Sequence, residues 1–196
     1  LRVVDREADR EIGSADEAVA LLGMTHVRSL VMAAALGASF KNVPGIDLKQ
    51  FWRYSLRAAD IAKSLAGVLH QNQGGAFTAG LIHAIGVLVM HIAMPDRMAP
   101  ININTPPLDL NRAAAERAAF GYTYAEVGAG MVEKWQFPEE MVSALSNQLT
   151  PFEGEAYDPL AGVLHLASWR ARAEELQLDD NGLAATFPDM VGLTLG

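Results

Sequence analysis

The most apolar stretch of the chain is AFTAGLIHAIGVLVMHIAM, residues 76–94, and the sequence PDR at 95–97 ends it. Two glycines and two histidines interrupt the stretch, and QGG at 73–75 precedes it. A membrane-spanning helix needs about 20 predominantly apolar residues, so this stretch is marginal in length for a span. We interpret it as the buried central helix of a globular domain.

Helix start and stop signals lie on both sides of this stretch. Asp47 begins DLKQ, which resembles a capping box ahead of a long helix that runs to about residue 70. Gly121 supplies a helix stop, Thr123 begins the capping sequence TYAE, and Asp158 precedes a proline that opens another helix. No run with a period of two residues is long enough for a strand. The pattern predicts an all-α, multi-helix fold in a single domain.

Three further segments have their own signals. Residues 95–107 contain four prolines and predict a loop. Residues 108–120 predict a helix with a polar face. Gly128 and Gly130 lie within a helical pattern, which favours close packing against another helix over a ligand-binding loop.

Composition and charge exclude several classes of protein. The 196-residue chain is 51% hydrophobic and 19% charged, which is typical of a globular domain, and it carries a formal net charge of −8. An acidic chain lacks the basic face that nucleic-acid binding needs. The absence of cysteine excludes a disulfide scaffold and a cysteine nucleophile. The charged first ten residues show no secretory signal, and we expect a cytoplasmic protein with no nucleic-acid or membrane partner.

The histidines are the main candidates for chemistry. His83 and His91 are eight residues apart, which puts them two helical turns apart and about 80° off a common face, so a shared metal is not expected. His165 lies on an apolar helical face, where a histidine is either a hydrogen-bonded core residue or a ligand. No Gly-x-Ser-x-Gly sequence is present to support a nucleophilic triad. The residues alone therefore describe a helical domain without an assembled site.

Several short motifs occur in the order of a known family. They are FWRYS at 51–55, AGLIHAIG at 79–86, FG at 120–121, GAGM at 128–131, WQFP at 135–138 and HLAS at 165–168. Together they resemble the HDOD family (HD-related output domain), a degenerate branch of the HD phosphohydrolase superfamily, over nearly the whole chain. The resemblance implies an HD-superfamily-like helical bundle over residues 1–196. Because LRVVD at 1–5 resembles the middle of that domain, we expect its N-terminal helices to be missing here.

The resemblance also places the metal ligands of the superfamily's hydrolases on this chain. The first histidine of those enzymes falls at Tyr54, and their His-Asp pair falls at His83 and Ala84. Their late aspartate falls at Ser168. One of the four primary ligands is therefore retained, and a phenol, a methyl group and a hydroxyl replace the others.

Further histidines of related two-metal enzymes fall near Tyr124 and at Asn147 and Gln148. We expect the seven positions to line a vestigial cleft with no metal, no cofactor and no catalytic residue, because one imidazole does not hold a hydrolytic metal ion. His83 is expected to hydrogen-bond a neighbouring helix, with a ligand role as the alternative. Tyr54 and Tyr124 are expected to fill the former metal cleft.

The function implied by the resemblance is a non-catalytic output module of bacterial signal transduction, such as the output domain of a response regulator. Its partners would be other proteins, with a receiver or another signalling domain upstream. The apolar face at residues 15–40 would serve self-association or a neighbouring chain. Two alternatives are a metal-dependent phosphohydrolase with a degenerate site and a sensor domain that binds a nucleotide messenger.

Overall fold

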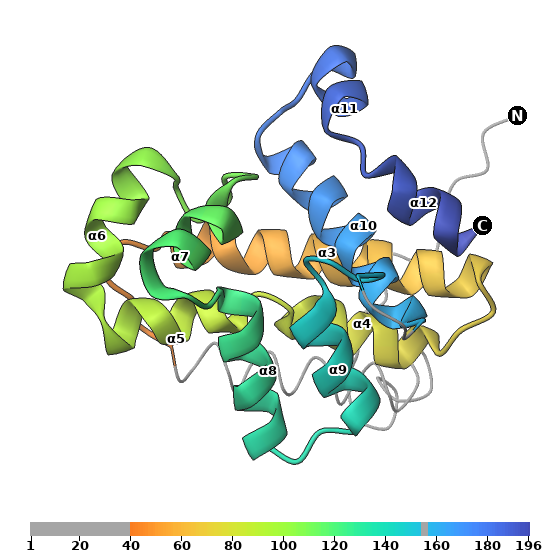
Figure 1. Cartoon of the computed structure of the whole chain (residues 1–196), viewed down its shortest axis with the longest axis horizontal. Helices are drawn as coiled ribbons and strands as arrows, with labels where there is room; N and C mark the ends of the chain where they lie inside the picture. Colours follow the sequence, from red (N-terminus) through yellow and green to blue (C-terminus); the bar gives the residue numbers. More distant parts are fainter. Residues whose placement is uncertain (1–39, 154–156) are drawn as a thin grey trace, which may run out of the picture.

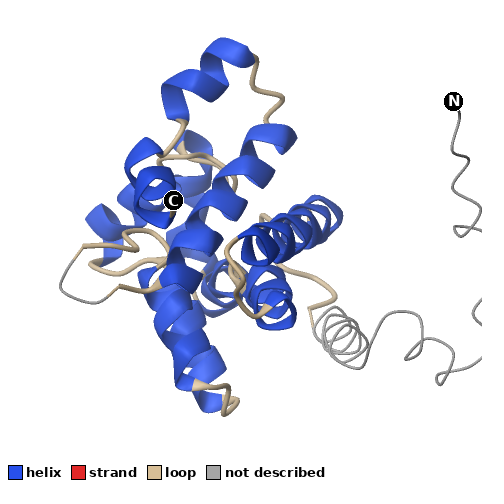
Figure 2. Cartoon of the chain, turned by 90° about the vertical axis from the view of Figure 1, so that its right-hand side faces the viewer, coloured by secondary structure: helices blue, strands red, loops and turns tan. Residues whose placement is uncertain are grey.

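The computed structural model describes residues 40–153 and 157–196, and this part of the chain contains helices and no strand (Figures 1 and 2). The all-α prediction is therefore confirmed. The face expected at residues 15–40 lies almost entirely outside the described residues. The helices are α3 (Leu48–Val68), α4 (Gln73–Ile82), α5 (Ile85–Ala93), α6 (Pro95–Asn104), α7 (Arg112–Phe120), α8 (Tyr124–Lys134), α9 (Glu139–Asn147), α10 (Pro159–Glu175), α11 (Asp180–Thr186) and α12 (Asp189–Leu195).

Helix α3 is the longest described element and packs against both α4 and α10 (Figure 1). It begins as the sequence predicts, because the Asp47 carboxylate accepts hydrogen bonds from the backbone N–H groups of Lys49 and Gln50. Small residues on its buried face, such as Ala59 and Ala62, let the neighbouring helices approach closely. The polar members of that face, which include Tyr54, are thereby placed inside the protein.

The apolar stretch at 76–94 forms two helices, α4 and α5, instead of the single helix that we expected. A turn at His83 and Ala84 separates them, and the N–H of Val87 donates to the Ala84 carbonyl at 2.9 Å. By length and composition Gln73–Ala93 could cross a membrane, but 83% of its most apolar window is buried inside the protein. A segment that is mostly buried inside the protein has the environment of a core segment.

The proline-rich segment after α5 is helical, and the prediction of a loop there is wrong. Pro95 occupies the first turn of α6, where its missing N–H has no intrahelical partner to lose. Pro100 lies inside the same helix and removes one backbone hydrogen bond. Contacts of Asn102 with His91 and Arg112 hold this helix against α5 and α7, so tertiary contacts override the local preference.

Helices α5 and α8 are in backbone contact at Gly86 and Gly128. A Cβ atom at Gly86 would lie 2.0 Å from the Tyr124 carbonyl oxygen and 2.7 Å from the Gly128 nitrogen. Gly128 therefore serves close helix packing, as predicted. Gly130 does not, because nothing lies within 4 Å of its Cβ position. The capping box at the start of α8 is present, with Thr123 and Glu126 satisfying each other's backbone N–H groups.

Two ion pairs join α3 to α10 along their exposed edge. Arg53 binds Glu175 through two N–O contacts of 2.6 and 2.5 Å, and Arg57 binds Glu174 through contacts of 2.6 and 3.0 Å. Exposed pairs of this kind contribute little to stability, but their forked geometry fixes the register of one helix on the other. Residues on the inner faces of α3 and α10 are thereby aligned.

Candidate functional site

A hydrogen-bonded chain of buried polar side chains lies where α3, α4 and α10 meet. The His83 ring nitrogen Nδ1 lies 2.6 Å from the Gly80 carbonyl oxygen, and Nε2 lies 2.7 Å from the Tyr54 hydroxyl oxygen. A carbonyl only accepts, so Nδ1 carries the hydrogen and Nε2 accepts one from the Tyr54 hydroxyl. Both nitrogens of His83 are therefore engaged by protein groups.

Arg172 on α10 completes this chain. Its Nε donates to the Tyr54 hydroxyl at 3.1 Å, and its Nη2 donates to the Tyr124 hydroxyl at 2.6 Å. The guanidinium also lies over both phenol rings, 5.8 Å from the Tyr54 centroid and 5.6 Å from the Tyr124 centroid. A guanidinium is protonated at every accessible pH, so a fixed positive charge lies between the two tyrosines. We name Tyr54, His83, Tyr124 and Arg172 the tyrosine–arginine cluster.

Sequence reasoning missed Arg172, although one signal was available. Arg172 lies four residues after Ser168, so the two share a face of α10. The same face carries small and apolar buried residues such as Leu164, and an arginine is fully buried only where it has partners.

Gln148 follows α9, and its side chain is linked to the cluster through the backbone of His83. Its Nε2 donates to the carbonyl oxygens of His83 and Leu145 at 3.0 and 2.8 Å, and it is buried. The backbone carbonyl oxygen of Gln148 in turn accepts a hydrogen bond from Nδ1 of His165 at 2.8 Å. The turn at His83 is thereby tied to the end of α9 and to α10.

The other three positions given by the family resemblance, Ala84, Ser168 and Asn147, lie in different surroundings. Ala84 is buried beside His83 and offers only a methyl group. Ser168 donates to the His165 carbonyl oxygen at 3.0 Å and lies on the wall of a cleft next to Arg172. Asn147 does not join the others, because its exposed amide donates to the Ser143 hydroxyl at 3.2 Å.

The cleft has a volume of about 620 Å³ and opens beside the cluster. Residues from α7, α9 and α10 line it, together with the segment that follows α11. Its polar wall includes the following side chains: Asn111, Arg117, Ser146, His165, Ser168 and Arg172.

Burial keeps both titratable members of the His83–Tyr54 pair neutral. It lowers the pKa of His83 to about 4, with the charge of Arg172 acting in the same direction and the bond to Gly80 opposing it. Burial raises the pKa of Tyr54 to about 12, against the influence of Arg172. At neutral pH the imidazole accepts and the phenol donates, as the geometry requires.

The metal ion of the HD superfamily does not fit these residues. A divalent ion needs a free ring nitrogen or carboxylate oxygens, whereas both nitrogens of His83 are engaged and Ala84 supplies no oxygen. The guanidinium of Arg172 would also repel a second cation. No group of three or more His, Cys, Asp or Glu side chains within residues 40–153 and 157–196 is placed to hold a metal.

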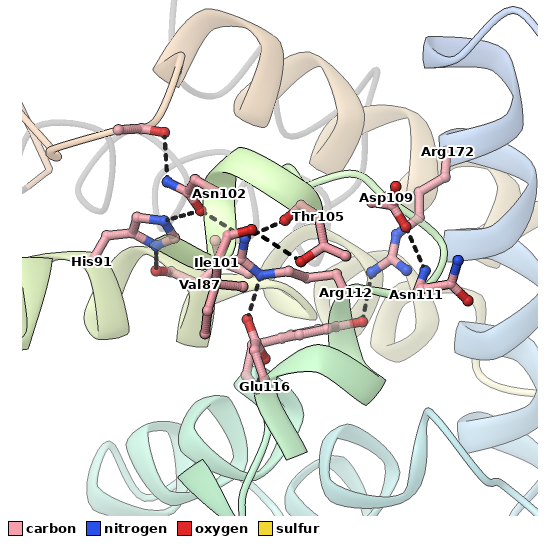
Figure 3. A network of polar contacts seen from close by, with 12 residues as sticks. Val87, His91, Ile101, Asn102, Thr105, Asp109, Asn111, Arg112, Glu116 and Arg172 are labelled. Atoms are coloured by element: carbon pink, nitrogen blue, oxygen red, sulfur yellow. Dashed lines mark hydrogen bonds and ion pairs between the residues drawn. The ribbon is translucent and has the colours of Figure 1, made fainter. Parts of the chain in front are cut away.

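A second buried network lies next to the first (Figure 3). Arg112 and Glu116 form an ion pair one turn apart on α7 at 2.8 Å, with both side chains fully buried. Arg112 also donates to the Asn102 side chain at 2.6 Å and to the Thr105 carbonyl at 2.7 Å. The other carboxylate oxygen of Glu116 accepts from the backbone N–H of Tyr124 at 2.7 Å, so Tyr124 belongs to both networks.

The pKa of His83 has a consequence for stability. The unfolded chain binds a proton near pH 6.5, whereas folded His83 resists protonation until about pH 4. The stability that neutral His83 contributes is therefore complete above its pKa in the unfolded chain. It is lost as pH falls from that pKa towards the pKa in the folded protein. We expect the free energy of unfolding to fall by roughly 2 kcal/mol from about pH 7.5 to about pH 5 on account of His83.

Urea unfolding at both pH values, on the wild type and on His83→Gln, measures this contribution. Burial also lowers the pKa of His91 and of His165, so the wild type and His83→Gln should both lose some stability in acid. The wild type should lose the larger amount. Equal losses in the two proteins would show that His83 is not the group responsible.

Comparison with known proteins identifies the family. The HDOD domain matches residues 6–151, and this chain belongs to the HDOD family. A proposed phosphohydrolase from Shewanella amazonensis SB2B is 31% identical to it, with a TM-score of 0.80 over 95% of this chain and 68% of that one. No curated protein matches the chain.

Two more distant structures share the fold. An HDOD domain protein of unknown function from Geobacter sulfurreducens is 21% identical, with a TM-score of 0.75 over 93% of this chain and 64% of that one. A proposed signal transduction protein from Marinobacter aquaeolei VT8 is 23% identical, with a TM-score of 0.69 over 94% of this chain and 46% of that one. The chain therefore spans only part of the length of these proteins.

Proposed function

We propose that this HDOD domain is a non-catalytic output module of a bacterial signal-transduction protein and that it acts through contact with other proteins. The observation that carries the proposal is the position of the Arg172 guanidinium between Tyr54 and Tyr124. These tyrosines fall where the resemblance places histidine ligands of the superfamily's metal. An organic cation in that place supplies charge and hydrogen bonds but neither a Lewis acid nor an activated water.

The comparisons support the signalling part of the proposal. One protein of the same fold carries the name of a proposed signal transduction protein, and the present chain covers 46% of its length. The remainder of such a protein offers room for a receiver or another sensory domain. In this proposal the whole protein works in the cytoplasm, and the HDOD domain passes the signal to a partner protein or to a second copy of the chain.

Metal analysis tests the non-catalytic part. We expect purified protein, dialysed without chelator, to hold well below one transition-metal ion per chain. We also expect it to hydrolyse bis-p-nitrophenyl phosphate in the presence of Mn²⁺ no faster than buffer does. His83→Gln should leave that background unchanged. About one tightly held metal per chain, or a hydrolysis rate that His83→Gln abolishes, would favour the second candidate function.

That second candidate is a phosphohydrolase with an altered site. The observation in its favour is the name of the 31% identical relative, a proposed phosphohydrolase. Signalling output in cells separates the two candidates. Tyr54→Phe keeps the ring and removes the hydroxyl, so a contact module that folds should keep its output with this variant. Deletion of the whole domain should abolish output.

A further inference from the structure

The charges on the wall of the cleft differ from those of the chain. The chain has 23 acidic and 15 basic residues, whereas no carboxylate of residues 40–153 and 157–196 lines the cleft. Of its two arginines, Arg117 pairs with Glu126 and Arg172 has no such partner among the described residues. An unpaired arginine on the wall of a cleft attracts anions.

Arg172 is the unusual member of this wall. Its side chain is buried, with 7% of the residue exposed, and its hydrogen-bonding partners are the hydroxyls of Tyr54 and Tyr124. Among the described residues, no carboxylate forms an ion pair with it. A buried charge without a counter-charge is costly to keep in the protein.

The other buried arginine gives the contrast within the same molecule. Arg112 is fully buried as well, but it is neutralised by the carboxylate of Glu116 at 2.8 Å. Among exposed arginines, Arg170 pairs with Glu174 at 3.2 Å and Arg117 pairs with Glu126 at 2.7 Å. These three arginines each have a carboxylate partner, whereas Arg172 has none in the part of the chain that the structure describes. An anion bound in the cleft beside Arg172 would supply the missing counter-charge.

The neighbouring groups suit an anion with several oxygen acceptors. Ser146, Thr150, Ser168 and Trp169 line the same cleft as Arg172. The hydroxyls and the guanidinium offer donors to the oxygens of a tetrahedral oxyanion. A volume of about 620 Å³ lies within the range of small-molecule sites and exceeds what a bare ion fills.

We propose that the cleft binds a small organic molecule bearing a phosphate group, with the phosphate beside Arg172 and the organic part towards Trp169. The inference rests on the proposed function in one respect, because it takes the bound phosphate ester to remain intact. The ligand would then be a signal that the output module receives.

Phenyl phosphate and inorganic phosphate are suitable probes, with sodium acetate and sodium chloride at equal ionic strength as controls. We expect both phosphates to raise the melting temperature in a saturable manner, because a ligand that binds only the folded state stabilises it. Phenyl phosphate should also change the fluorescence of Trp169, measured as the difference between the wild type and Trp169→Phe. Acetate should bind at least about tenfold more weakly than phosphate, which corresponds to the loss of about one charge-assisted contact.

A matched pair of variants on α10 locates the site. Arg172→Met should raise the Kd for phenyl phosphate by at least about tenfold. Arg170→Met is the control, because Arg170 lies on the same helix, is exposed and pairs with Glu174, so its Kd should stay close to that of the wild type. If Arg172→Met does not fold, Arg172→Lys keeps the charge and loses the fork. Calorimetry on that variant should then show weakened binding.

Three results would overturn the proposal: no saturable binding of either phosphate to the folded wild type, equal binding of acetate, or equal losses for Arg172→Met and Arg170→Met. Release of phenol from phenyl phosphate is measured in the same samples. Binding with enzyme-dependent release would support the phosphate site and contradict the non-catalytic function. Absence of both binding and release would overturn the phosphate site and leave the proposed function standing.

Discussion

Gly86→Ala is expected to prevent stable folding of the domain. The new methyl group would lie 2.0 Å from the Tyr124 carbonyl oxygen and 2.9 Å from the carbon of the same carbonyl, and both are backbone atoms that cannot swing aside. Helices α5 and α8 would have to separate, which opens the core around them. We expect a loss of more than about 4 kcal/mol, at the upper end of single-residue effects. Thermal melting followed by circular dichroism measures it.

Gly130→Ala is the matched control on α8. Nothing lies within 4 Å of its Cβ position, and a glycine inside a helix is less favourable than alanine by roughly 0.5–1 kcal/mol. The control variant should therefore melt slightly higher than the wild type. A Gly86→Ala protein that melts within a few degrees of Gly130→Ala would show that the backbone contact between α5 and α8 does not exist.

Glu116→Gln should be the most damaging change of a single charge. The substitution keeps the volume of the side chain but leaves the buried Arg112 without a counter-charge and places an amide beside donors. Removal of one partner of a buried ion pair costs about 3–5 kcal/mol. The bond from the Tyr124 N–H to the carboxylate is weakened as well. Urea unfolding gives the difference directly.

Two companion variants show whether burial is the cause. Glu174→Gln breaks the exposed pairs with Arg57 and Arg170 and should cost less than about 1 kcal/mol. The double variant Arg112→Met with Glu116→Leu removes both charges and should be more stable than Glu116→Gln alone, because no unpaired charge remains. If the double variant is the less stable of the two, the hydrogen bonds of Arg112 matter more than its charge.

The helical fold could be predicted because its signals are local. The cap at Asp47, the box at Thr123 and the stop at Gly121, which has a φ of 80°, depend on residues within a few positions of one another. The segment at 95–107 could not be predicted in this way. Its prolines oppose a helix locally, and the contacts of Asn102 that hold α6 in place come from α5 and α7.

The candidate site was predictable in part. The positions taken from the family resemblance bring Tyr54, His83, Tyr124 and Gln148 together in the structure. Asn147 points elsewhere, because a shift of one residue on a helix rotates a side chain by about 100°. Gln148, the adjacent position, is the one that faces inward.

The charged core residues could not be predicted. Arg112 and Glu116 are spaced as an exposed i,i+4 pair would be, and residues 108–120 therefore predict a helix with a solvated polar face. Their burial depends on α6 and α8, which cover that face from other parts of the chain. The role of Arg172 likewise depends on two tyrosines that α3 and α8 supply.

Tyr124 is held at both ends, by Glu116 on its backbone N–H and by Arg172 on its hydroxyl. The first bond comes from α7 and the second from α10, so the first residue of α8 fixes the rotation of that helix about its own axis. A rotation of α8 alone would strain both bonds at once. Helices α7 and α10, which contribute one bond each, are therefore connected to one another through a single residue, Tyr124.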